Sequence, residues 1–79
     1  MNTREAEQLL VEAFLDVAPD ADLTTVAADA AYREALGIDS MDFLAILEEV
    51  AKQTGVEIPE ADYPKIETFG GFVSYLCAA

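Results

Sequence analysis

The stretch that most constrains the fold is residues 36–42, where Gly37-Ile-Asp-Ser-Met-Asp leads directly into a run with helical periodicity. Glycine tolerates the left-handed backbone of tight turns, so Gly37 predicts a turn. Over residues 41–54, apolar side chains recur at intervals of three and four, which predicts an amphipathic helix. We therefore expect Asp39 and Ser40 at the N-terminus of this helix, with the Ser40 hydroxyl exposed.

Ser40 has two physical interpretations. A helix start leaves backbone N–H groups unpaired and carries partial positive charge, which favours a phosphate on or near the hydroxyl. Asp-Ser before an apolar run is also a common N-cap, which contributes about 1 kcal/mol without any chemistry. A tripeptide alone favours the cap, because short motifs occur often by chance. The spacing of the other landmarks decides between the two.

The helix after Ser40 is expected to have a buried apolar stripe, with Ile46 at its edge. Asp42, Glu48 and Glu49 lie outside this stripe. Phe43 lies off the centre of this stripe. It either remains near the surface beside Ser40 as a partner contact, or packs under the preceding loop. The residues expected in the stripe are Met41, Leu44, Leu47, Val50, Ala51 and Thr54.

A first helix is expected from a cap at Thr3 to the Ala18-Pro19 pair, since proline disfavours helix in the residue before it. Residues 20–35 form a long connection with sparse apolar anchors, and residues 30–36 could form a short helical turn. We expect Tyr32 to be a core side chain that pins this connection. The apolar positions of the first helix are Ala6, Leu9, Leu10, Ala13, Phe14 and Val17.

The last third of the chain completes a small bundle. Gly55 predicts a left-handed end to the second helix, and residues 56–59 an extended link. Residues 60–63 can make one short turn before Pro64, Ile66 should be buried, and Thr68 should cap a last helix. The predicted fold is all-α: one domain over residues 1–79, a four-helix bundle with three longer helices, a short third helix and a long loop between the first two.

Composition excludes several classes of function. The 16 acidic and 4 basic residues give a net charge of −12, which argues against nucleic acid and anionic membranes and favours basic protein partners. The chain has no histidine, which excludes the usual zinc sites and histidine-based catalysis, and its acids do not follow the EF-hand pattern. We expect no enzyme and no metal.

Cys77 is the single cysteine, and the first residues lack a signal-peptide pattern, so we expect a reducing, cytoplasmic location.

Independent landmarks add to the Asp-Ser motif. Ser40 is followed by Glu57-Ile58-Pro59, and then by Lys65-Ile-Glu-Thr before the last helix. The order and spacing of these landmarks, over nearly the whole chain, resemble those of the acyl carrier protein family. The resemblance implies that Ser40 carries a phosphopantetheine arm, that Asp39 precedes it as part of the attachment site, and that the cofactor comes from coenzyme A.

The chain also departs from the family pattern. Family members usually carry more glutamates along the outer face of the second helix, where this chain has Ala45, Ala51 and Lys52. Met41 replaces the usual leucine, and Phe43 stands where a small or polar residue is frequent. These differences point to a specialised stand-alone carrier with its own partners.

The function implied by the resemblance is that of a monomeric carrier holding acyl groups as thioesters for fatty-acid, polyketide or related lipid biosynthesis. Its expected partners are a phosphopantetheinyl transferase and acyl-transferring or acyl-activating enzymes with basic docking patches. The alternatives are a peptidyl or aminoacyl carrier, or an unmodified acidic helical module in which Ser40 is only a cap. The residues expected to contact partners are Asp42, Met41, Phe43, Glu48 and Glu49.

Overall fold

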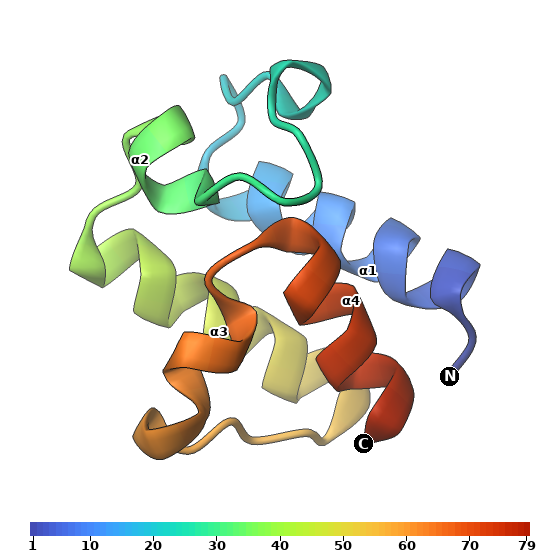
Figure 1. Cartoon of the computed structure of the whole chain (residues 1–79). Helices are drawn as coiled ribbons and strands as arrows, with labels where there is room; N and C mark the ends of the chain where they lie inside the picture. The colour runs from blue at the N-terminus through green and yellow to red at the C-terminus, as the bar shows by residue number, and fades with distance from the viewer.

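The computed structural model describes residues 1–79 and confirms an all-helical bundle. Helix α1 packs against both α3 and α4, and η2 packs against α4 (Figure 1). The connection between α1 and α2 passes over one end of the bundle, next to the start of α4. The elements in chain order are α1 (Thr3–Val17), η1 (Leu23–Thr25), α2 (Tyr32–Leu36), α3 (Ser40–Thr54), η2 (Glu60–Ile66) and α4 (Phe69–Ala78).

The core is made only of apolar and aromatic side chains. Phe14 from α1 lies at its centre and meets the ring of Tyr32 edge-on, with 4.9 Å between the ring centroids. Tyr32 is 1% exposed, which confirms its predicted role as the side chain that pins the long connection. Its hydroxyl donates a 2.6 Å hydrogen bond to the Ile66 carbonyl, and burial raises the pKa of the phenol. Ile66 is buried, as predicted.

Local capping rules explain most helix ends. Thr68 caps α4 by accepting a 3.0 Å hydrogen bond from the Gly71 N–H, and Gly55 ends α3 in the left-handed conformation, both as predicted. The prediction of Thr3 as the cap of α1 is wrong by one residue. Asn2 is the N-cap, because it forms a capping box with Glu5 in which each side chain accepts from the other residue's backbone N–H.

The buried stripe of α3 differs from the prediction. Phe43, Ile46 and Val50 are its buried residues, whereas Met41 is 80% exposed and Leu44 is 49% exposed. Apolar residues occupy more than one face of this helix, so periodicity alone could not say which face is covered. The packing of α1 on α3, and the approach of Tyr63 from η2 to Phe43, select the observed face.

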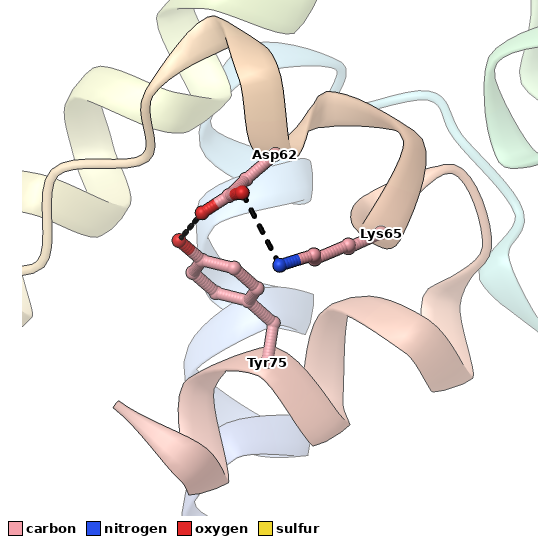
Figure 2. Close-up of polar contacts among 3 residues, drawn as sticks. All are labelled: Asp62, Lys65 and Tyr75. Atoms are coloured by element: carbon pink, nitrogen blue, oxygen red, sulfur yellow. Dashed lines mark hydrogen bonds and ion pairs between the residues drawn. The ribbon is translucent and has the colours of Figure 1, made fainter.

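Element η2 is a seven-residue 3₁₀ helix that contains Pro64, which is longer than the single turn predicted for residues 60–63. It is tied to α4 by a small polar cluster, in which the Tyr75 hydroxyl donates a 2.7 Å hydrogen bond to Asp62 Oδ2 (Figure 2). Lys65 Nζ lies 3.3 Å from the other carboxylate oxygen. A Cβ at Gly71 would lie 2.7 Å from the Lys65 carbonyl oxygen, so the close approach of α4 to η2 requires a glycine there.

The long connection is fastened to the start of α4. The Gly70 N–H donates a 2.9 Å hydrogen bond to the Ala28 carbonyl, and Ala31 forms an isolated antiparallel bridge with Thr68. These contacts fix the chain just before α2, and α2 leads into α3. None of the helices combines the length and apolarity needed to cross a membrane. No cluster of His, Cys, Asp or Glu side chains is arranged to hold a metal ion.

Candidate functional site

The turn between α2 and α3 is fixed by the backbone. Gly37 adopts φ +67°, the left-handed conformation that ends α2, as its place in the sequence predicts. The Ile38 N–H donates a 2.9 Å hydrogen bond to the Arg33 carbonyl, and the Ile38 side chain is buried. The turn therefore delivers the next two residues, Asp39 and Ser40, to the start of α3 in one defined orientation.

Asp39 is the N-cap of α3, and Ser40 is the first residue of the helix. Asp39 Oδ1 accepts a 2.8 Å hydrogen bond from the Asp42 N–H. The interpretation of Ser40 as the capping residue is therefore wrong, because the carboxylate one position earlier already accepts from the backbone. The Ser40 side chain is exposed, and its hydroxyl oxygen is not engaged with the helix start.

An arginine that the sequence analysis missed lies beside Ser40. The guanidinium of Arg33, on α2, donates a 3.2 Å hydrogen bond to Ser40 Oγ. The same guanidinium lies over the ring of Phe43, with its central carbon 4.6 Å from the ring centroid. The available signal was scarcity: Arg33 is the sole basic residue between Arg4 and Lys52.

The structure corrects the assignment of Phe43 as a partner contact. Its side chain is only 5% exposed and meets the ring of Tyr63 edge-on, with the centroids 5.2 Å apart and the planes at 90°. Of the two alternatives left open by the sequence, Phe43 therefore packs inside. Its ring contacts both the Arg33 guanidinium and Tyr63 of η2.

The remaining residues expected to contact partners lie along α3. Met41 is the most exposed large apolar side chain of the protein, Glu48 is exposed, and Asp42 and Glu49 are half-buried. Leu44, which was predicted to be buried, joins Met41 on the surface, since residues three apart share a helix face. The exposed residues of α3 thus include the apolar pair Met41 and Leu44 and the acidic Glu48, with Lys52 and Gln53 exposed further along.

The residues at this site fit a phosphate ester on Ser40. The hydroxyl is exposed, lies at the positive end of a 15-residue helix, and is already in contact with a guanidinium. Guanidinium groups form strong, directional hydrogen bonds with phosphate oxygens. A phosphodiester in this position would therefore meet both a helix start and a fixed cation.

Residues 8–76 match the family described as the phosphopantetheine attachment site, and the chain belongs to that family. The protein is thus a carrier of covalently attached 4′-phosphopantetheine, a class whose domains generally perform no catalysis themselves and act with a transferase and acyl-handling enzymes. A search among solved structures finds no match.

Proposed function

We propose that Ser40 is the attachment residue and that the protein carries acyl groups for partner enzymes. The observation that carries this proposal is the Ser40 hydroxyl, which is exposed, unused by the helix cap, and in contact with Arg33 within the region of the family match. The attached group supplies a terminal thiol that holds an acyl group as a thioester, and the protein supplies its placement.

The attachment reaction needs an external enzyme. In it, Ser40 Oγ forms a bond to the pantetheine-bearing phosphorus of coenzyme A, the bond from that phosphorus to the second phosphate breaks, and adenosine 3′,5′-bisphosphate leaves. The hydroxyl proton passes to a base on the transferase. The chain itself has no histidine to act as this base, and the carboxylate of the adjacent residue, Asp39, is engaged as the N-cap.

The outer face of α3 is the surface we propose for partner docking. Met41 and Leu44 supply exposed apolar area next to Ser40, and Asp42, Glu48 and Glu49 supply negative charge. The occupants that match this surface are the transferase and acyl-handling enzymes that present an apolar contact within a basic patch. The net charge of −12 attracts such partners over a longer range.

The cargo we propose is an acyl chain of fatty-acid, polyketide or related lipid biosynthesis, with a peptidyl or aminoacyl group as the alternative within the same class. An unmodified acidic module is the remaining alternative. It is disfavoured by the family match, and it loses its explanation for Ser40, because Asp39 rather than Ser40 caps α3.

Intact mass after incubation with coenzyme A and a broad-specificity phosphopantetheinyl transferase tests the proposal. The chain has two serines, Ser40 and Ser74, and both are exposed, so Ser74→Ala is a matched control for Ser40→Ala. We expect one phosphopantetheine group on the parent chain and on Ser74→Ala, and none on Ser40→Ala. Modification of Ser40→Ala would overturn the site, and a folded parent chain that several transferases leave unmodified would favour the acidic module.

A further inference from the structure

We infer that Arg33 is a positioning residue for the arm: its guanidinium orients the Ser40 hydroxyl before attachment and binds the phosphodiester afterwards. The inference rests on the proposed function, since it requires the phosphate on Ser40. Its starting point is the 3.2 Å hydrogen bond from the Arg33 guanidinium to Ser40 Oγ. That oxygen is the atom that becomes the bridging ester oxygen on attachment, so the phosphate's remaining oxygens are added within reach of the same guanidinium.

Arg33 is held by contacts of both its side chain and its backbone. Its guanidinium stacks over Phe43, and Phe43 is itself fixed against Tyr63 of η2. Its carbonyl accepts hydrogen bonds from the Gly37 and Ile38 N–H groups in the turn that leads to Ser40. The side chain is partly buried. A guanidinium restrained in this way loses less conformational entropy on binding a phosphate than a free surface side chain does.

The charges around Ser40 indicate why a cation is needed at this contact. Attachment places a permanent negative charge next to Asp39 and Asp42, in a chain whose net charge is already −12. The other three basic residues are placed elsewhere: Arg4 in the first turn of α1, Lys52 in the last turn of α3, and Lys65 in an ion pair with Asp62. Arg33 is thus the cation available to offset repulsion of the new phosphate by its acidic neighbours.

The same arrangement predicts a difference between the apo and holo proteins. The guanidinium interacts more strongly with a phosphodiester anion than with a neutral hydroxyl, so its contribution to stability should increase on attachment. Removing the charge should therefore destabilise the holo protein more than the apo protein. A purely structural role, in which Arg33 only packs on Phe43, would lower both by the same amount.

The test compares thermal unfolding and ³¹P NMR of apo and holo forms at low salt for the parent chain, Arg33→Met, Arg33→Lys and Lys52→Met. Methionine keeps the packing on Phe43 without the charge, lysine keeps the charge without the planar fork, and Lys52→Met removes one charge at the far end of α3. Intact mass first establishes that each sample carries one arm, and the Ser40→Ala and Ser74→Ala comparison assigns it to Ser40.

We expect the holo-minus-apo difference in Tm to fall by about 2–4 °C in Arg33→Met relative to the parent chain. Arg33→Lys should recover part of this loss, Lys52→Met should show none of it, and 0.5 M salt should shrink it. The ³¹P resonance of the phosphodiester should shift in Arg33→Met and remain in place in Lys52→Met.

Two results would overturn the role of Arg33 while leaving the carrier function intact. One is a holo form of Arg33→Met that has the same holo-minus-apo difference in Tm and the same ³¹P shift as the parent chain. The other is an equal change in Lys52→Met, which would show a general charge effect only. If Arg33→Met does not fold, Arg33→Lys is compared with the parent chain instead. Loss of the planar fork should also shift the ³¹P resonance, and an unshifted resonance would overturn the role of Arg33. A parent chain without an arm on Ser40 would overturn both proposals.

Discussion

Asp39 and Ser40 are adjacent in the sequence, but only the Asp39 side chain caps α3. A serine that capped α3 would accept a hydrogen bond from the backbone and hold its hydroxyl against the helix end. Asp39 accepts that bond instead, with 2.8 Å between its Oδ1 and the Asp42 nitrogen. The Ser40 side chain is therefore exposed and not used by the cap, as the proposed attachment requires.

This division predicts unequal effects on stability. Asp39→Ala should lower the free energy of unfolding by about 1 kcal/mol, because an N-cap is lost, and lower Tm by about 4–8 °C. Ser40→Ala should change the free energy of unfolding by less than about 0.5 kcal/mol, because Ser40 is not the cap and its one hydrogen bond, from Arg33, is exposed to solvent. Thermal unfolding followed by circular dichroism measures both.

Asp39→Asn is the control, because an asparagine oxygen also caps helices well and should keep most of the stability. A Ser40→Ala variant as unstable as Asp39→Ala would contradict this assignment of the cap.

Among the elements, η2 depends on the polar contact that joins it to α4. Donation from the Tyr75 hydroxyl, with a further contribution from Lys65, holds the pKa of the Asp62 carboxyl below its ordinary value. A lowered folded-state pKa stabilises the fold fully above the unfolded-state pKa of about 4, and this contribution is lost as pH falls through the folded-state value. The same hydrogen bond raises the pKa of Tyr75, so on the alkaline side the contribution is lost as pH rises above about 10.

Tyr75→Phe should therefore lower Tm at neutral pH by an amount that declines below about pH 4 as Asp62 is protonated. Thermal unfolding of both proteins between pH 2.5 and 8 gives this difference directly. Tyr63→Phe is a control, since no hydrogen bond of the Tyr63 hydroxyl is present and its ring contact with Phe43 is kept. A Tyr75→Phe deficit that stays constant across this range would exclude the Asp62 carboxylate as its cause.

Local rules predicted the elements well, because caps and turns depend on a few adjacent residues. Gly37, Gly55 and Thr68 perform their predicted roles, and the Asp-Ser motif does begin a helix. The cap of α1 is Asn2, one residue before the predicted Thr3, because Asn2 forms reciprocal hydrogen bonds with Glu5.

The faces of the elements were harder to predict, because they depend on which other elements arrive. Met41, Phe43 and Leu44 are all apolar and lie within one turn of α3. The sequence around them does not indicate that Tyr63 packs against Phe43 rather than against one of the others. Arg33 was missed for the same reason, since its contact with Ser40 requires the folded turn at Gly37. Ser40 could be proposed from the sequence because the landmarks around it follow one another along the chain, whereas its contact with Arg33 exists only in the folded protein.

For the whole molecule, charge and exposed apolar area are combined on one helix. The net charge of −12 produces a long-range attraction for any basic partner, but it does not by itself select an orientation. In the proposed docking surface Met41 and Leu44 would give the short-range contact, and Asp42 lies between them in the sequence, two residues after Ser40. Orientation on a partner should therefore depend on Asp42 more than on acids of α1.

Asp42→Lys should lower the second-order rate constant of modification by the transferase roughly 3- to 10-fold at low salt, because it places positive charge beside Ser40. At 0.5 M salt the difference should largely disappear, since screening shortens the range of the repulsion. Glu7→Lys changes the net charge by the same amount from an exposed position on α1, and it should have a much smaller effect. Equal slowing by the two variants would mean that net charge alone guides the transferase, and the outer face of α3 would then lose its role in docking.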